Sequence, residues 1–212
     1  MQVSPYIINN AWLKDRGNLV QFAAMPSKQE IEDEDIRTMR EAAAGNENAF
    51  AVIIRKWQKP LINFFYRSTQ SVELAEDLAQ MTFIKLYRSA ERYEPTAKFS
   101  TFLFHIGRHL LINEIRRQNR KPQEATDPAA FTQTPDGQNE YTYFEIEEAF
   151  MRALQTLPEK QKTAILLLKQ QALSYEEIAQ TMDASAAAVK SWIHRARQKL
   201  KEELQDFYAH TP

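Results

Sequence analysis

The chain has 212 residues, a net charge of −1 and no cysteine. The lack of cysteine excludes disulfides and thiolate metal sites, and no apolar run reaches the roughly 20 residues that a membrane-spanning helix needs. The amino terminus lacks the basic-then-apolar order of a signal peptide, so we expect a cytoplasmic protein. Four glycines, few alternating β-branched residues and many runs of Leu, Ala, Glu, Lys and Arg predict an all-α fold.

The small net charge conceals an uneven distribution of charge along the chain. Residues 85–121 hold nine Lys or Arg and three Glu, whereas residues 122–151 hold seven acidic residues and no Lys or Arg. A further block, residues 190–201, holds five Lys or Arg and no acidic residue. Separate basic blocks are compatible with nucleic-acid binding, so the overall charge does not exclude such a partner.

Residues 1–28 show no clear period and are expected to form a loose extension. Residues 29–121 follow as a first helical domain, in which apolar periodicity predicts helices over about 30–45, 48–68, 72–92 and 100–119. The acidic residues from Glu30 to Asp35 suit the start of a helix, because they face the positive end of its dipole. Pro60 should kink the second helix.

The carboxyl-terminal half is predicted to be a separate domain. Residues 122–140 contain three prolines and a glycine and predict a flexible acidic linker. Residues 141–207 form the second domain, with two helices leading into a helix-turn-helix, and residues 208–212 form a tail. The predicted architecture is two small helical domains joined by the linker.

The segment Leu173–Leu204 has the pattern of two helices joined by a tight turn. Ser174 and Glu177 have capping-box spacing at the start of the first helix, and Ser185 is placed as the N-cap of the second. Asp183 stands in the turn, where glycine is common, and aspartate tolerates the left-handed backbone region better than most residues.

The second helix of this pair should bury a narrow apolar stripe and expose a basic face. The stripe comes from residues at helical spacing, namely Val189, Ile193, Ala196, Leu200 and Leu204. The opposite side and its flanks carry Ala187, Lys190, Ser191, His194, Arg195, Arg197 and Gln198. This pattern is typical of a DNA-binding helix-turn-helix. The alternative is an amphipathic helix pair with a solvated basic face.

Four stretches in a fixed order carry a family resemblance. They are AEDLAQMTFIKLYR (75–88), KFSTFLFHIGRHLLINEIRR (98–117), LPEKQKTAILLL (157–168) and LSYEEIAQTMDASAAAVKSWIHRARQKL (173–200). Together they resemble the bacterial RNA polymerase sigma factors of the extracytoplasmic-function (ECF) class. The resemblance implies a promoter-specificity subunit that binds core RNA polymerase, recognises the minus-35 and minus-10 promoter elements and assists DNA melting.

The resemblance also implies a role for each domain. Residues 29–121 correspond to sigma region 2, which binds core polymerase and the minus-10 element, and residues 141–207 to region 4, which binds the minus-35 element. The expected minus-35 residues are Ser185, Ala187, Lys190, Ser191, His194, Arg195 and Arg197. The expected core-polymerase contacts are Asp77, Gln80, Lys85 and Arg88, which without the resemblance would be interpreted as a solvated helix face.

The second stretch is where the family melts and reads the minus-10 element as single-stranded DNA. It combines aromatic rings with basic residues, which is the composition that single-strand binding needs. The expected residues are Lys98, Phe99, Phe102, Phe104, His105, Arg108, Asn113, Arg116, Arg117 and Arg120. One or two of the Phe rings are expected to lie in the core instead. The sequence has Phe102, Phe104, His109 and Asn113 among the positions where the family usually has Trp, Tyr, Asn and Asp, so the preferred bases are open.

His105 and His109 are four residues apart on one predicted helix, which is a spacing that metal sites use. No carboxylate or cysteine lies obviously near them in the sequence, so no metal ion is expected and the histidines are interpreted as polar residues beside DNA. No phosphate loop, nucleophile elbow or HExxH motif is present, so neither an enzyme nor a cofactor is expected.

Three interpretations of function remain at this stage. The first is the sigma factor, with core polymerase and promoter DNA as partners and an anti-sigma factor as a further candidate. The second is a free-standing helix-turn-helix regulator, and the third is a helical protein-binding adaptor. The linker has two interpretations of its own, a segment threading the polymerase channels and a plain tether.

Overall fold

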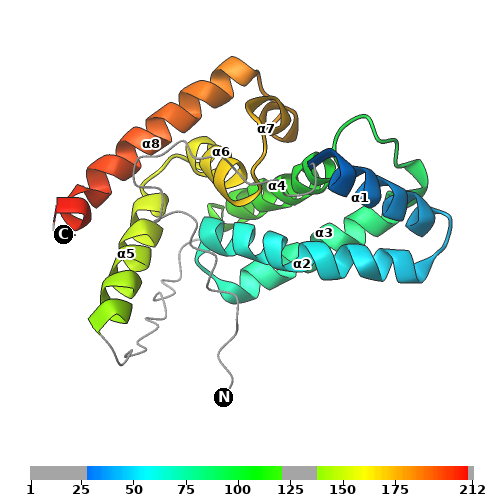
Figure 1. The fold of residues 1–212 in the computed structure, drawn as a ribbon, viewed down its shortest axis with the longest axis horizontal. Coiled ribbons are helices and arrows are strands. Elements are labelled where there is room, and N and C mark those ends of the chain that lie inside the picture. Colours follow the sequence, from blue (N-terminus) through cyan, green and yellow to red (C-terminus); the bar gives the residue numbers. More distant parts are fainter. Residues whose placement is uncertain (1–27, 121–137, 210–212) are drawn as a thin grey trace.

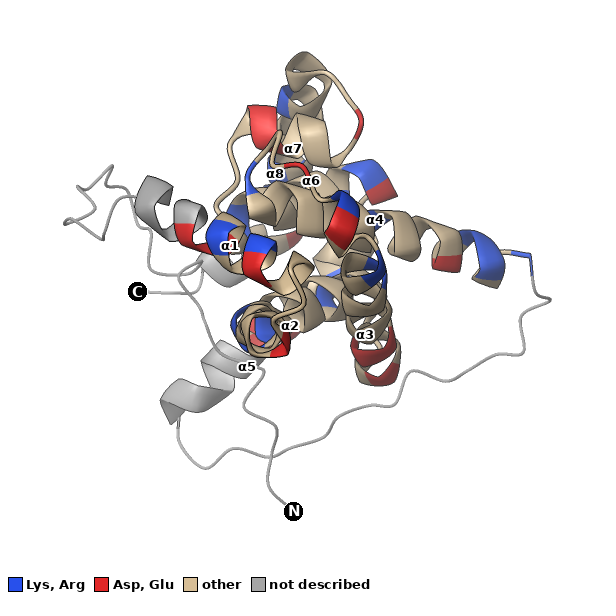
Figure 2. Ribbon diagram, turned by 90° about the vertical axis from the view of Figure 1, so that its right-hand side faces the viewer, with Lys and Arg blue, Asp and Glu red and all other residues tan. Residues whose placement is uncertain are grey.

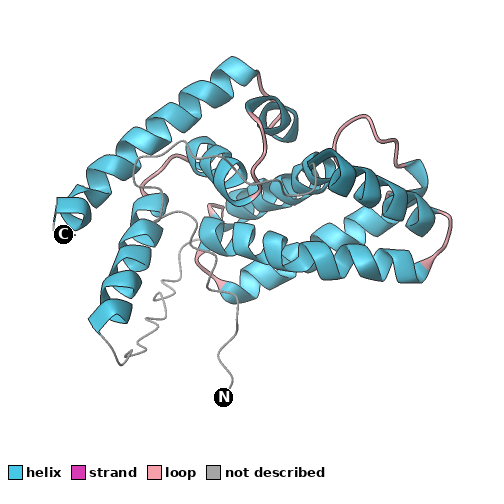
Figure 3. Cartoon of the chain, viewed as in Figure 1, coloured by secondary structure: helices cyan, strands magenta, loops and turns pink. Residues whose placement is uncertain are grey.

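The computed structural model describes residues 28–120 and 138–209, and all regular structure in these two ranges is helical (Figures 1 and 3). The helices are α1 (Lys28–Ala43), α2 (Glu47–Thr69), α3 (Val72–Arg88), the 3₁₀ turn η2 (Ala90–Arg92), α4 (Phe99–Gln118), α5 (Gln138–Gln155), α6 (Glu159–Gln170), α7 (Tyr175–Thr181) and α8 (Ala186–Ala209). The predicted all-α fold is confirmed. None of these helices combines the length and apolar character that a membrane crossing requires.

Several helices begin at capping residues. The side chain of Asn46 accepts a hydrogen bond from the backbone N–H of Ala49 at the start of α2, and Ser71 does the same for Leu74 at the start of α3. The predicted third helix, 72–92, was too long. Ser89 ends it, because its N–H donates to the carbonyls of both Lys85 and Leu86 and tightens the last turn.

The core of the first half lies between α2, α3 and α4. Its largest side chains are fully buried aromatic residues, namely Phe64, Phe65, Phe99 and Phe104. Gly107 lets α4 approach α2 closely, since a Cβ at this position would lie 3.0 Å from the ring of Phe65. The same point lies 3.5 Å from Thr82 Oγ1, so side chains of both α2 and α3 limit how α4 can pack.

The core of the second half lies between α5, α6 and α8. The stripe predicted for α8 is confirmed, because Val189, Ile193, Ala196, Leu200 and Leu204 are all buried. Helix α5 begins at Gln138, inside the segment 122–140 that was predicted to be a linker, and the rest of that segment, residues 122–137, lies outside the described residues.

The two halves pack against each other, and their buried apolar residues form one continuous cluster. Helices α5 and α6 contact α2, and α7 contacts α4 (Figure 1). Arg67 of α2 forms an ion pair with Glu147 of α5 at 2.8 Å, and Gln70 donates to the carbonyl of Met151 at 3.0 Å. Burial raises the pKa of the Glu147 carboxyl, although Arg67 opposes the shift. The sequence did not predict this contact between the halves.

Candidate nucleic-acid interface

The turn between α7 and α8 has the geometry that its sequence predicted. Ser174 and Glu177 form a reciprocal capping box, with Ser174 N–H donating to the Glu177 carboxylate at 2.7 Å. Asp183 adopts the left-handed conformation with φ of 51°, and Ser185 accepts a hydrogen bond from Ala188 N–H at 3.2 Å. These contacts fix the amino-terminal end of α8 relative to α7.

Helix α8 presents its polar face to solvent. Ala187, Lys190, His194, Arg195 and Arg197 are exposed and Ser191 is partly exposed, on the side away from the buried stripe. Four of these residues can donate hydrogen bonds through charged or imidazole groups, and the small residues at the start of the helix leave room for close approach. This face has the shape and chemistry of a major-groove reader.

The aromatic candidates on α4 separate into two groups. Phe99 and Phe104 are fully buried and contact Trp57, with ring centroids 5.9 and 6.1 Å apart. They belong to the core, as expected for one or two of the three rings, and offer no surface for stacking on DNA in this structure. Phe102 is partly exposed and packs on Tyr93 at 5.2 Å. It is the one ring of the three predicted that has an accessible surface.

The basic candidates on α4 also differ in exposure. Asn113, Arg116, Arg117 and Arg120 are exposed near the carboxyl-terminal end of α4, which projects from the bundle (Figure 2). Arg117 makes a two-pronged contact with Glu114 at 2.7 Å. Lys98 at the other end pairs with Glu177 of α7 at 2.5 Å. The projecting end is therefore the accessible basic surface of this helix.

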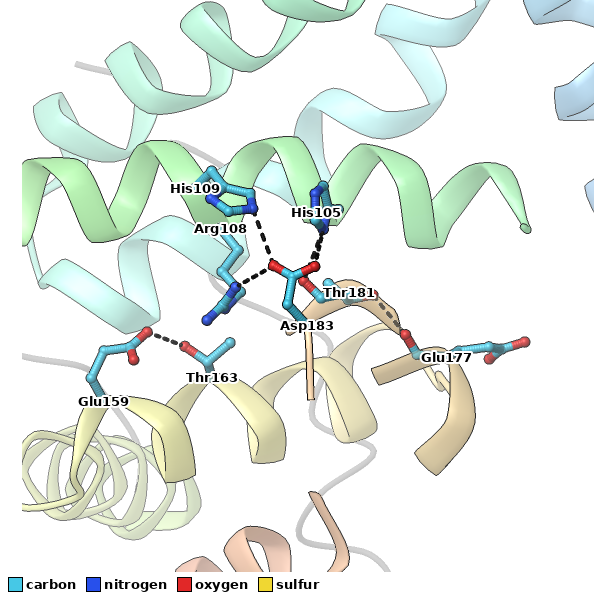
Figure 4. Close-up of polar contacts among 8 residues, drawn as sticks. All are labelled: His105, Arg108, His109, Glu159, Thr163, Glu177, Thr181 and Asp183. Atoms are coloured by element: carbon cyan, nitrogen blue, oxygen red, sulfur yellow. Dashed lines mark hydrogen bonds and ion pairs between the residues drawn. The ribbon is translucent and has the colours of Figure 1, made fainter. Parts of the chain in front are cut away.

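The middle of α4 faces the turn that precedes α8 (Figure 4). Arg108 is buried and lies 3.5 Å from the Asp183 carboxylate, while His109 Nε2 lies 3.3 Å and His105 Nδ1 lies 3.8 Å from the same carboxylate. His105 Nδ1 is also 3.3 Å from the carbonyl of Thr181. His105 and Arg108, both predicted to contact DNA, thus contact the second half of the chain instead.

These contacts correct one step in the sequence reasoning. We expected no carboxylate near the two histidines, yet Asp183, 74 residues beyond His109 in the sequence, lies beside both. Local spacing could not reveal this neighbour, because it depends on how the two halves pack.

Helix α3 exposes the four residues predicted to contact polymerase, namely Asp77, Gln80, Lys85 and Arg88. The structure adds apolar residues that the sequence interpretation missed. Met81, Ile84 and Tyr87 are 45%, 38% and 55% exposed on the same helix. Exposed apolar residues beside polar ones are typical of protein-binding surfaces. Their spacing of three residues was a signal that could have been read from the sequence.

Comparison with known proteins gives two family matches. The model of Sigma-70 region 2 matches residues 53–121, and the model of Sigma-70, region 4 matches residues 147–200. The first range covers most of α2 with α3 and α4, and the second covers the second half of α5, all of α6 and α7, and most of α8.

Individual proteins agree with these matches. The ECF RNA polymerase sigma-E factor of Haemophilus influenzae is 30% identical over 171 residues, which cover 76% of this chain and 90% of the relative. The structure of CnrH in complex with the cytosolic domain of CnrY has a TM-score of 0.61 at 24% identity, covering 82% of this chain and 99% of that one. The sigma factor RpoE of Bartonella quintana, solved with the anti-sigma factor NepR, has a TM-score of 0.52 at 22% identity, covering 84% and 98%. These two structures share the all-helical fold of this chain.

Proposed function

The chain belongs to the ECF class of RNA polymerase sigma factors, and from this premise we propose which of its surfaces carries out each step of promoter recognition. As a sigma factor it is a promoter-specificity subunit of transcription initiation and acts with core RNA polymerase and promoter DNA. Sigma factors confer specificity and are not themselves catalysts.

Helix α8 is proposed to read the minus-35 element in the major groove. The observation that carries the proposal is the separation of its two faces, with Val189, Ile193 and Ala196 buried and Lys190, His194 and Arg195 exposed. The capped turn holds α8 at a fixed angle to α7, so the exposed face can be presented to DNA as a rigid unit.

Helix α4 and the segment before it are proposed to hold the minus-10 element. Phe102 offers a ring for an unstacked base, and Arg116, Arg117 and Arg120 offer phosphate contacts at the projecting end. Asn113 is exposed between these groups and can donate and accept hydrogen bonds at a base edge.

The exposed face of α3 is proposed to bind core polymerase. Asp77 and Gln80 supply polar contacts, and Met81, Ile84 and Tyr87 supply apolar area that would be buried against the partner. Interfaces of this kind combine an apolar centre with a polar rim.

The packing of α4 against α7 and the turn before α8, which we call the closed arrangement, must open before Lys98, His105 and Arg108 can reach DNA. In it, Lys98 is paired with Glu177, and Arg108 is buried against Asp183. Binding to polymerase would have to separate the halves and expose this part of α4. A relative has been solved with an anti-sigma factor, and we propose that a protein of that kind is a further partner of this chain.

In vitro transcription from fragmented genomic DNA of the encoding organism, with core polymerase, tests the proposal. We expect transcripts that start downstream of shared minus-35 and minus-10 sequences only when this chain is added. A duplex-binding assay without polymerase serves as the counter-test. Specific duplex binding by the chain alone, together with no added transcripts, would favour the free-standing regulator.

A further inference from the structure

Two imidazoles and one carboxylate converge where α4 meets the turn before α8 (Figure 4). His105 and His109 lie on adjacent turns of α4, with ring centroids 4.5 Å apart, and Asp183 reaches them from the other half of the chain. One ligand atom from each of the three side chains lies within 4.8 Å of the others. Within the described ranges, no other group of three His, Cys, Asp or Glu side chains is arranged in this way.

We propose that His105, His109 and Asp183 bind a divalent transition-metal ion that joins the two halves of the chain. Zinc bonds to imidazole nitrogen and carboxylate oxygen are about 2.0–2.2 Å long, so ligand atoms in a tetrahedral site lie about 3.3–3.6 Å apart. Asp183 Oδ2 lies 3.3 Å from His109 Nε2, and the other carboxylate oxygen, Oδ1, lies 3.8 Å from His105 Nδ1. Small side-chain rotations would bring all three onto one ion.

The donor set determines which ions suit the site. Two imidazole nitrogens and one carboxylate favour zinc, nickel, cobalt or copper, whereas magnesium and calcium prefer oxygen ligands throughout. The carbonyl of Thr181, 3.3 Å from His105 Nδ1, or a water molecule can supply a fourth ligand. Three protein side chains with one further position is the arrangement of an open zinc site, whose fourth ligand can be a water molecule.

Arg108 competes with an ion for the same carboxylate. Its guanidinium lies 3.5 Å from Asp183 Oδ2, and its Nε is buried without a hydrogen-bond partner among the described residues. A fixed positive charge beside the site lowers affinity for a cation, so removing that charge should strengthen binding. This expectation distinguishes a metal site from a plain ion-pair contact.

Because its ligands come from both halves of the chain, a bound ion would hold the halves together. The importance of this effect rests on the proposed function. His105 and His109 belong to the half with the proposed minus-10 surface, and Asp183 belongs to the half with the proposed minus-35 helix. An ion that needs ligands from both halves binds the closed arrangement alone. At about 100 times its dissociation constant, it would favour that arrangement about 100-fold.

Titration of the metal-free full-length chain with zinc chloride, followed by calorimetry, tests the site without DNA or polymerase. We expect one zinc ion per chain, and at least a tenfold loss of affinity in Asp183→Asn and in His109→Gln. Asn keeps the shape of the side chain and tolerates the φ of 51° at this position. His194→Gln, at an exposed position on α8, is the matched control and should bind zinc like the wild type. Arg108→Met should bind zinc more tightly, and magnesium chloride should give no comparable binding.

A second measurement tests the link between the halves. The chain has no cysteine, so Glu73→Cys and Lys201→Cys, both exposed and in different halves, allow two fluorophores to be attached. Zinc should raise energy transfer in the wild-type background and leave it unchanged with Asp183→Asn.

Equal zinc affinity in the wild type, Asp183→Asn and His109→Gln would overturn the site. Zinc binding that depends on these residues without a change in energy transfer would overturn its role in joining the halves. Neither measurement depends on transcription, so the metal site and the sigma-factor assignments are tested separately.

Discussion

At the scale of single residues, Arg195 provides the most direct test of base recognition. It is exposed on the polar face of α8, opposite the buried Ile193 and Ala196. We expect Arg195→Ala to cost about 1–3 kcal/mol of binding at one base pair and to relax preference there, as loss of a major-groove contact does. Competition binding of holoenzyme to promoters substituted at each minus-35 position would measure it.

The matched control for this variant is Lys199→Ala. Lys199 is on the same helix but is paired with Glu203 at 2.8 Å, and it lies beyond the turns we assign to base contacts. Its loss should leave the order of preferred sequences unchanged. An unchanged order with Arg195→Ala as well would show that α8 does not read bases through this residue.

Tyr93 gives a prediction about pH. Burial raises the pKa of Tyr93 to about 12 from the ordinary 10.0, and its hydroxyl is buried without a partner among the described residues. The unfolded chain releases this proton near pH 10 and the folded chain does not, so the stabilisation is present below pH 10 and is lost as pH rises through about 12. Tyr93→Phe should remove this dependence and raise the free energy of unfolding at pH 7 by about 1 kcal/mol.

Urea unfolding at several pH values between 9 and 12 would measure the effect. Tyr87→Phe, at a ring that is 55% exposed, is the control and should keep the slope because Tyr93 is still present. The same slope in wild type and Tyr93→Phe would contradict the assignment.

The residue scale also shows where sequence patterns stop being informative. The alternation of rings and basic residues around Phe99 and Phe104 suits DNA stacking and core packing equally well. The structure separates them, because Phe99 and Phe104 pack on Trp57 of α2 and are fully buried. This packing joins α2 to α4, so it cannot be predicted from the sequence around Phe99 and Phe104.

At the scale of elements, the exposed face of α3 is proposed to bind core polymerase through several residues together. Asp77 and Gln80 are exposed and lie beside Met81 and Ile84 on the same helix. We expect Asp77→Lys with Gln80→Ala to reduce co-purification with core polymerase at least tenfold, because a reversed charge at the rim of an apolar contact opposes binding. Pull-down with tagged core enzyme would measure it, with circular dichroism to confirm folding.

Glu41→Lys is a suitable control, since Glu41 is exposed on α1 and the change adds the same positive charge elsewhere on the same half. Equal loss of polymerase binding in both variants would point to net charge and not to the α3 face.

Helix positions were predictable because capping residues and apolar periods are local. Ser174 with Glu177, Ser185 and the stripe from Val189 to Leu204 all appear in the structure as the sequence predicted. The error at the end of α3 has a local cause as well, in that Ser89 hydrogen-bonds back to the carbonyl of Leu86. Such competition between a serine side chain and the helix is weak and cannot be recognised from composition.

At the scale of the whole molecule, the sequence predicted two domains but not their contact. Pairs such as Lys98 with Glu177 and Arg67 with Glu147 join residues about 80 positions apart. Each of these charged residues, taken alone in the sequence, is of a type that is common at ordinary surface positions. Only the packing of one half on the other turns these charges into partners, and it also brings Asp183 to the two histidines.

Glu177 allows the closed arrangement to be weakened without disturbing α7. Its carboxylate caps α7 through Ser174 N–H and pairs with Lys98 of the first half. Glutamine can serve the same capping box, so Glu177→Gln should keep the helix and lose the ion pair. A partly exposed pair of this kind contributes about 1 kcal/mol or less, so the ratio of closed to open chain should fall by up to about fivefold.

Energy transfer between the labelled positions 73 and 201 would report this shift. Binding of a single-stranded minus-10 oligonucleotide should strengthen by a similar factor as α4 becomes accessible.

Glu176→Gln is the control, because Glu176 is the exposed neighbour on the same helix and carries the same charge. A change of equal size in that variant would mean that the acidity of α7, and not its contact with Lys98, governs access. An unchanged ratio with Glu177→Gln would mean that the apolar contacts between the halves hold the closed arrangement by themselves. Opening would then require the binding energy that polymerase supplies.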